Sequence, residues 1–263
     1  SLIYISYYLF MTKGRIVVPK EYDAIKESSK GIAGFMGLSM GKKEFHNRKV
    51  IESYASFMNE HFSKAFFFIS DFPKVHNIHA IEDIFGDKAF RRANIQSIEL
   101  AHFVTSVINQ FPNIEVYPFS NIRYELDAYR NNLSSLHGEY FLQKKGSIMM
   151  NRSFYEDCQK VVKEFLTLPT NLAKIQANQR NSLEQAMYYA VPGYLEELAM
   201  LLALPRWNRL GNNEQFPVCE IYPGKSEVQM KLQGGWYPLS DFHHLLINPK
   251  YTFMEAYYEP SHP

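Results

Sequence analysis

The chain has 263 residues, of which 46% are hydrophobic and 21% are charged, and its formal net charge is +1. This composition is that of an ordinary globular protein, and the length is enough to bury a sizeable core. The small net charge does not exclude nucleic-acid binding, because a local basic patch is sufficient for it. The two cysteines, Cys158 and Cys219, lack the spacing of a zinc site or a disulfide framework.

The sequence contains no run of about 18 apolar residues, which is the length that a membrane-spanning helix needs. Residues 1–11 are apolar and rich in tyrosine, but they lack the basic start of a signal peptide, and we expect a strand or packing arm there. Low cysteine usage fits a reducing compartment, so we expect a cytoplasmic protein, and a monomer. No linker, repeat or low-complexity tract divides the sequence, which predicts a single domain over residues 1–263.

The first predicted elements lead to a serine. A short β-branched run at 14–19 and a polar connection at 21–29 precede a buried strand that begins at Gly31 and ends in a turn with Ser39 at its tip. A serine between a strand and a helix is well placed as a nucleophile, because the turn lifts the hydroxyl out of the sheet. The same position is also typical of a serine that caps the following helix.

Strands and helices alternate behind this serine. The spacing of apolar residues predicts a helix over 43–62, and the apolar run at 64–72 is typical of a buried parallel strand. A long helical segment at 78–111 and a strand at 114–119 follow. This alternation predicts an α/β fold in which helices cover both faces of a mostly parallel sheet.

The second half of the sequence is mostly helical in pattern. Apolar stripes predict helices over 154–166 and 183–201, and Pro192-Gly193 should interrupt and kink the second of them. Late strands are predicted at 216–222 and 252–258.

The serine turn matches a short catalytic motif. Gly37-Leu-Ser-Met-Gly41 fits G-x-S-x-G, the nucleophile elbow of α/β-hydrolases. However, Ser39 follows only the first strong strand, whereas the hydrolase elbow normally follows several. His243 and His244 lie downstream, but no Asp/His pair is marked out as a triad. A serine esterase is therefore one hypothesis for the function.

Four stretches occur in an informative order. They are Gly-Leu-Ser-Met-Gly-Lys at 37–42, Gly-Asp-Lys-Ala-Phe-Arg-Arg at 86–92, Tyr-Leu-Glu-Glu-Leu at 194–198 and Tyr222-Pro223. In this order they resemble tRNA-dependent cyclodipeptide synthases, and the resemblance runs from about residue 31 to residue 223. Lys42 and Pro223 place the sequence with the branch of that family that has Tyr-Pro rather than Tyr-His.

The resemblance implies a Rossmann-like domain similar to the catalytic domain of class I aminoacyl-tRNA synthetases. It implies an enzyme that joins the amino acids of two aminoacyl-tRNAs into a cyclic dipeptide, without ATP, another cofactor or a metal, because each ester is already activated. The sequence agrees, since it contains neither a G-x-x-x-x-G-K-[ST] loop nor a G-x-G-x-x-G fingerprint.

The resemblance also implies residue roles. Ser39 becomes an aminoacyl ester with the first substrate, a second aminoacyl-tRNA converts it into a dipeptidyl ester, and ring closure releases the serine. The base that activates Ser39 is left open between the ribose end of the tRNA and a nearby group. Tyr222 is expected to relay a proton during ring closure, and it ends a strand at the edge where α/β proteins bind ligands.

The substrate ammonium group needs a carboxylate partner. Of the adjacent Glu196 and Glu197, helical spacing places Glu197 near Tyr194 and the apolar stripe, so we choose Glu197, with Tyr194 assisting. The family pattern has its tyrosine four residues before the glutamate, where this chain has Gly193. Either Tyr194 takes that role or Tyr189 reaches in from the turn above; a solvated surface charge is the alternative for Glu197.

The remaining expectations concern the substrate pocket and tRNA. Gly37 leaves room for a substrate side chain, with Phe35 and Phe68 as walls. Basic residues that follow the serine or open the long helix are candidate phosphate contacts or solvated helix faces: Lys42, Lys43, Arg48, Lys49, Lys88, Arg91 and Arg92. A non-catalytic Rossmann-like RNA-binding module is the third hypothesis, beside the synthase and the esterase.

Overall fold

The structure is a computed structural model. It describes residues 14–28, 31–144, 152–178, 182–207, 209–210, 217–224, 227–234, 237, 245–247 and 250–260. The packing arm expected at 1–11 and the pair His243 and His244 lie outside these residues.

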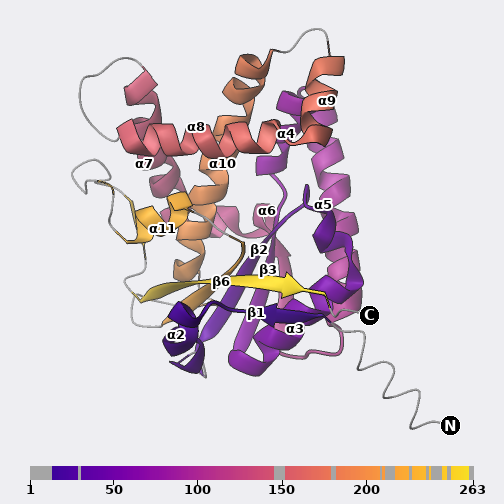
Figure 1. Ribbon diagram of the computed structural model, residues 1–263, viewed down its shortest axis with the longest axis vertical. Coiled ribbons are helices and arrows are strands. Elements are labelled where there is room, and N and C mark those ends of the chain that lie inside the picture. The colour runs from indigo at the N-terminus through magenta and orange to yellow at the C-terminus, as the bar shows by residue number, and fades with distance from the viewer. Residues whose placement is uncertain are drawn as a thin grey trace, which may run out of the picture.

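Six strands form one sheet in the order β1-β6-β5-β2-β3-β4 (Figure 1). Neighbouring strands are parallel throughout this sheet except for β1, which runs antiparallel to β6. The order reverses between β2 and β5, which is the topological switch point of a Rossmann-like sheet. The strands are β1 Arg15–Val17, β2 Ala33–Ser39, β3 Lys64–Ser70, β4 Ile114–Pro118, β5 Val218–Pro223 and β6 Tyr251–Glu259.

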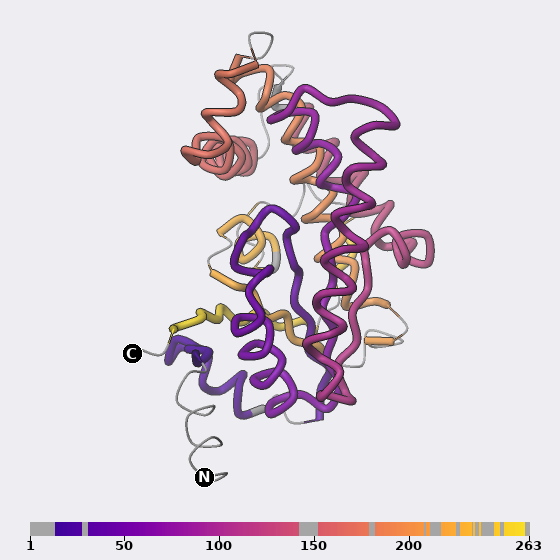
Figure 2. Tube along the Cα trace, turned by 90° about the vertical axis from the view of Figure 1, so that its right-hand side faces the viewer, coloured from indigo at the N-terminus to yellow at the C-terminus, as the bar shows by residue number. Residues whose placement is uncertain are grey.

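Helices surround this sheet, as the alternation in the sequence predicts. The α-helices are α2 Asp23–Ser28, α3 Arg48–His61, α4 Pro73–Glu82, α5 Asp87–Ile108, α6 Phe119–Ile122, α7 Asp127–Lys144, α8 Arg152–Leu166, α9 Pro169–Ala177, α10 Leu183–Ala203 and α11 Glu227–Gln233. Short 3-10 helices are η1 Lys20–Tyr22, η2 Lys43–His46, η3 Arg123–Glu125 and η4 Leu204–Arg206. Figure 2 shows the long helix α5 running along one side of the molecule.

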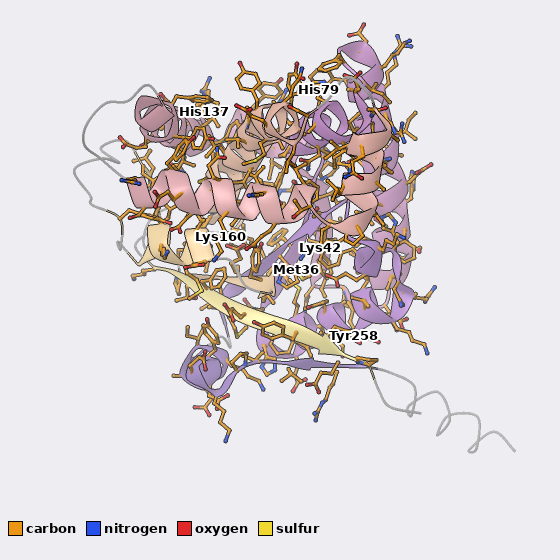
Figure 3. The ribbon with its side chains drawn as sticks, turned by 45° about the horizontal axis from the view of Figure 1, so that its top comes forward. Met36, Lys42, His79, His137, Lys160 and Tyr258 are labelled. Carbon is orange, nitrogen blue, oxygen red and sulfur yellow. The ribbon has the colours of Figure 1, made fainter. Side chains whose placement is uncertain are left out.

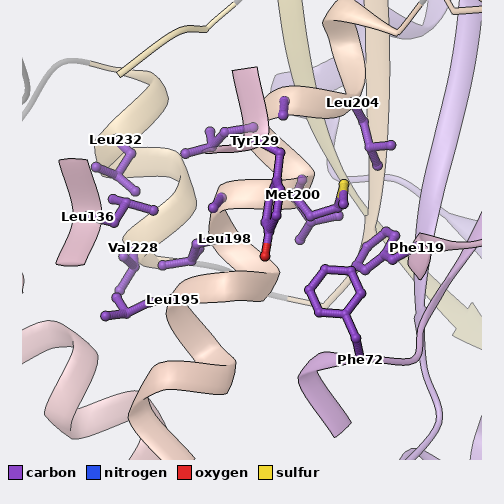
Figure 4. Close-up of a cluster of buried hydrophobic side chains, with 14 of the residues drawn as sticks. Phe72, Phe119, Tyr129, Leu136, Leu195, Leu198, Met200, Leu204, Val228 and Leu232 are labelled. Atoms are coloured by element: carbon purple, nitrogen blue, oxygen red, sulfur yellow. The ribbon is translucent and has the colours of Figure 1, made fainter. Parts of the chain in front are cut away.

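The alternation of side chains along each strand divides the core into two layers. On β2, Met36 points into the layer that contains α3 and α5, whereas Phe35 points into the layer that contains α7, α8 and α10. The second layer is centred on α10, which packs against α4, α7 and α8. Figure 4 shows Leu195 and Leu198 of α10 among side chains of α7 and α11.

Several boundaries differ from the sequence predictions. The helix predicted over 43–62 is shorter, because η2 precedes α3 and the Asn47 side chain caps α3 by accepting a hydrogen bond from the Lys49 amide at 3.0 Å. The segment predicted as one helix over 78–111 is divided into α4 and α5. Asp83 and Gly86 separate them with positive φ angles of 54° and 59°, which an α-helix cannot contain.

Other predictions were too coarse. The polar connection expected at 21–29 contains η1 and α2, and α7, α9 and α11 were not delimited from the sequence. Pro192 does not interrupt α10, which continues through it to Ala203. The five predicted strands after residue 30 are confirmed within a few residues; Phe216, where one was expected to begin, lies outside the described part of the chain.

Gly193 lies at a close contact between α10 and α4. A Cβ atom at this position would lie 2.7 Å from the Cβ of His76 and 2.8 Å from the carbonyl oxygen of Pro73. Neither atom can move freely, because the Pro73 oxygen belongs to the backbone and the His76 Cβ is bonded directly to it. Glycine is therefore required for the two helices to approach this closely.

We predict that Gly193→Ala lowers the free energy of unfolding by about 1–3 kcal/mol, because the added methyl group must push α10 away from α4. Gly138→Ala in α7 is the matched control, since no atom lies within 4 Å of its Cβ position. In that helix the alanine should stabilise the protein by about 0.5–1 kcal/mol. Urea denaturation of both variants measures the difference, and equal stabilities would contradict the close contact.

Candidate active site

Ser39 and Tyr222 lie near the carboxyl ends of β2 and β5, on either side of the switch point. The two strands pair only as far as Phe35 and Glu220. Beyond this level β2 continues beside β3, and β5 continues beside β6. Both residues therefore lie at the place where open α/β sheets bind ligands.

The same face of the sheet carries the candidate residues of β2. Phe35, Gly37 and Ser39 alternate with core residues of the other layer, so they share the face that looks toward α10. A Cβ on Gly37 would lie 3.1 Å from Cδ2 of Leu201 in α10. The missing side chain at residue 37 thus lets Leu201 pack closely against the strand, and Leu201 occupies the room that the sequence analysis assigned to a substrate side chain.

Glu197 and Tyr194 approach this face from α10. Ser70, at the end of β3, hydrogen-bonds the Glu197 carboxylate, and Lys42 is close enough to act on its charge. Burial raises the pKa of Glu197, and Ser70 and Lys42 oppose that shift. Burial holds the pKa of Tyr194 well above its usual range, and the nearby side chains of Cys158, Tyr222 and Glu197 add to the shift. The Tyr194 hydroxyl therefore keeps its proton.

The two residues considered beside them point elsewhere. The carboxylate of Glu196 lies 3.3 Å from Nε2 of His76 in α4. The ring of Tyr189 packs against Phe85, with the ring centroids 5.3 Å apart. The structure thus brings Tyr194, and not Tyr189, to Glu197 and Tyr222.

Lys42 connects the two strand ends. Its ammonium group donates a hydrogen bond of 3.2 Å to the backbone oxygen of Pro223 and lies 3.8 Å from the carboxylate of Glu44. Figure 3 shows Lys42 together with Met36 of the preceding strand. Lys42 therefore spans the switch point at a level where β2 and β5 no longer pair, and it supplies positive charge near Glu197.

The helix-cap interpretation of Ser39 is contradicted. Asn47 caps α3, and α3 begins only at Arg48. The carbonyl of Ser39 instead accepts a hydrogen bond of 3.1 Å from the Lys42 amide, which closes a tight turn. This local geometry also differs from the hydrolase elbow, in which the serine lies in a turn leading directly into a helix.

The expected pocket walls lie beneath the site. Phe35 and Phe68 are fully buried, and their rings meet edge to face with centroids 6.0 Å apart. Phe35 also stacks on Tyr251 of β6. These rings form a rigid apolar base below Ser39 and Tyr222.

Glu220 is a buried carboxyl group that the sequence analysis missed. Its Oε2 accepts hydrogen bonds from the Tyr251 hydroxyl and the Gln229 amide, whereas its Oε1 has no partner in the described part of the chain. Burial raises the pKa of Glu220 to about 8, and the charge of Glu197 adds to the shift. An acidic residue in the otherwise apolar strand Val218–Pro223 is the signal that could have identified it.

We predict a distinct pH dependence of stability from Glu220. Between its ordinary pKa of 4.5 and about 8, the unfolded chain releases this proton while the folded chain keeps it, so stability falls as pH rises through that window. In the wild type the free energy of unfolding should fall by on the order of a few kcal/mol between about pH 5 and about pH 9, and Glu220→Gln should abolish this decrease. Thermal unfolding across this range measures it, with the exposed Glu60→Gln as control; parallel pH profiles for wild type and Glu220→Gln would contradict the prediction.

The basic residues expected to contact tRNA are all exposed, but they differ in their partners. Arg48 pairs with Glu52 at 3.3 Å, and Arg92 pairs with Glu82 at 2.6 Å. Arg91 lines a cavity of about 330 Å³ beside Asp71, the residue that follows β3. Lys43, Lys49 and Lys88 lie on the surface.

The described helices include none that is long and apolar enough to cross a membrane. The sequence matches no protein-family model and no curated protein. Solved structures do share the arrangement of elements. A cyclodipeptide synthase (CDPS) from Fluoribacter dumoffii superposes with a TM-score of 0.71 over 95% of this chain and 99% of its own, at 14% identity. The chain has the cyclodipeptide synthase fold.

Two further structures with this fold connect it to tRNA. The Mycobacterium tuberculosis cyclodipeptide synthetase, described as related to type I tRNA synthetases, matches with a TM-score of 0.61 over 93% of this chain and 92% of its own, at 16% identity. The synthase of Candidatus Glomeribacter gigasporarum, solved with Phe-tRNAPhe bound, matches with a TM-score of 0.60 over 89% and 92%, at 14% identity. The Rossmann-like architecture expected from the sequence is thereby confirmed.

Proposed function

We propose that this chain is a tRNA-dependent cyclodipeptide synthase that uses two aminoacyl-tRNAs and a covalent serine intermediate. The observation that supports the proposal best is the convergence of Ser39, Tyr194, Glu197 and Tyr222 on one edge of the sheet. We also propose that the chain forms a single catalytic domain and acts as a monomer. Because the proposed substrates are aminoacyl-tRNAs, we propose that the reaction takes place in the cytoplasm.

In the first step Ser39 attacks the ester carbonyl of an aminoacyl-tRNA. The new bond joins Oγ to the acyl carbon, the bond from that carbon to the ribose oxygen breaks, and the tRNA leaves with a free hydroxyl group. Glu197 binds the ammonium group of the amino acid, since a charge-assisted contact in a partly buried site fixes the orientation of the substrate. Its side chain enters beside Gly37, above the buried rings of Phe35 and Phe68, where Leu201 must shift to admit it.

In the second step the amine of the aminoacyl-serine attacks the ester of the second aminoacyl-tRNA. This direction leaves the dipeptide on Ser39, whereas attack on the serine ester would transfer it to the tRNA. The raised pKa of Glu197 makes its carboxylate a better proton acceptor for the amine than an ordinary glutamate. The terminal amine then attacks the Ser39 ester, and Tyr222 relays the proton that Ser39 regains.

We predict that Ser39 carries the acyl group. Intact-mass measurement after incubation with a mixture of charged tRNAs should show an aminoacyl adduct on the wild type and none on Ser39→Ala. Ser56→Ala, on the exposed side of α3, is the control that should keep the adduct. Absence of an adduct on the wild type would contradict the proposal, and hydrolysis of simple esters without tRNA would support the esterase instead.

The adjacent glutamates of α10 provide a second test. We predict that Glu197→Gln lowers cyclic dipeptide production by about 100-fold or more, because the amine loses its charge partner and proton acceptor. Glu196→Gln should stay within about threefold of the wild type, because its carboxylate faces His76 of α4 and not the serine turn. Mass spectrometry of the culture medium measures the product; equal losses in both variants would contradict the assigned role.

A further inference from the structure

Lys74 is an ionisable residue close to the serine turn that the mechanism above does not use. It lies in the first turn of α4, which begins directly after β3. β2 and β3 are in register up to the pair Ser39 and Ser70. Lys74 therefore starts from the same edge of the sheet as the proposed nucleophile.

Gly41 lies between the two side chains. The position that a Cβ atom would take on Gly41 is 3.5 Å from Nζ of Lys74 and 3.9 Å from Oγ of Ser39. Because glycine has no side chain, nothing from residue 41 separates the amine from the hydroxyl. Because both atoms lie within 4 Å of that one position, they belong to the same small region beside the serine turn, and the flexible four-carbon stem of a lysine lets its amine move within it.

The Lys74 ammonium group has no hydrogen bond or ion pair with a described residue. Glu82 of α4, whose charge acts on Lys74, is itself paired with Arg92 of α5 and lies 3.8 Å from Lys174 of α9. From α10, Glu196 is occupied by His76. Burial, together with Lys174 and Arg92, therefore lowers the pKa of Lys74, and the opposing effect of Glu82 does not restore it.

We propose that Lys74 is the proton carrier that activates Ser39, an assignment that rests on the proposed synthase function. Neutral Lys74 accepts the proton of Ser39 as Oγ bonds to the acyl carbon. The lysine then donates that proton to the departing ribose oxygen as the carbon–oxygen bond of the ester breaks. Lys74 is neutral again at the end of the step, and no further reactant is needed.

The first experiment measures activation of Ser39 without tRNA. A fluorophosphonate probe labels an activated serine, and the labelling rate is followed by intact mass across pH. For the wild type we expect the rate to reach a plateau below the usual titration range of lysine. Lys74→Ala and Lys74→Arg should each lower the rate by about 100-fold or more, because neither offers a neutral amine near neutral pH.

Two controls separate this role from a structural one. Methylamine added to Lys74→Ala should restore labelling, because it supplies the missing amine. Lys64→Ala, at the opposite end of β3 where Lys64 lies 3.6 Å from Glu115, should label like the wild type. Unchanged labelling in Lys74→Ala, lack of labelling in the wild type, or loss without amine rescue in a folded Lys74→Ala would each overturn the proposal.

The second experiment uses charged tRNA in single-turnover acylation of Ser39. We expect Lys74→Ala to slow acylation at saturating tRNA and to leave the Kd for tRNA unchanged. A weaker Kd with an unchanged saturated rate would make Lys74 a phosphate contact and overturn its role as proton carrier. If the wild type forms no adduct with tRNA while probe labelling still depends on Lys74, the synthase function fails and the Ser39–Lys74 pair remains.

Discussion

The close contact of α10 with α4 determines how the candidate site is assembled. With Gly193 against α4, the helical period turns Glu196 toward His76 and turns Tyr194, Glu197 and Leu201 toward the sheet. Rotation of α10 by one residue would bury Glu196 at the sheet and remove Glu197 from Ser70. Gly193, where the family pattern has a tyrosine, is thus used for the close contact with α4, and Tyr194 projects from the adjacent face of α10.

Ionisable groups in this region are concentrated on both sides of the switch point. Glu197 and Glu220 project into the same layer, and after burial the charge of Glu197 contributes to the raised pKa of Glu220. Lys42 follows the serine turn, Lys74 approaches it from α4, and Lys42 partly compensates the charge of Glu197. Because burial already raises the pKa of Glu197 and Glu220, small changes in their contacts have large effects on how tightly they hold a proton. The site is therefore suited to steps in which protons move between neighbours.

The sequence predicted the sheet, most strands and the face of Glu197, because apolar periodicity reports local burial directly. It could not separate α4 from α5, since the break depends on backbone angles at Asp83 and Gly86 that no apolar pattern records. It also missed Glu220 and Lys74. Both depend on packing between segments far apart in the chain, Glu220 with Tyr251 and Lys74 with the turn at Gly41.

The end of strand pairing at Phe35 and Glu220 has a mechanical consequence. Ser39 and Tyr222 are carried by strand tips that share no ladder bonds at their own level, so the tips can separate or approach without breaking the sheet. The hydrogen bond from Lys42 to Pro223 is a link across them, and such a bond contributes only about 1.5–3 kcal/mol. One backbone oxygen and one flexible side chain thus couple the two strand tips weakly, so the separation between Ser39 and Tyr222 can change at a small cost in free energy.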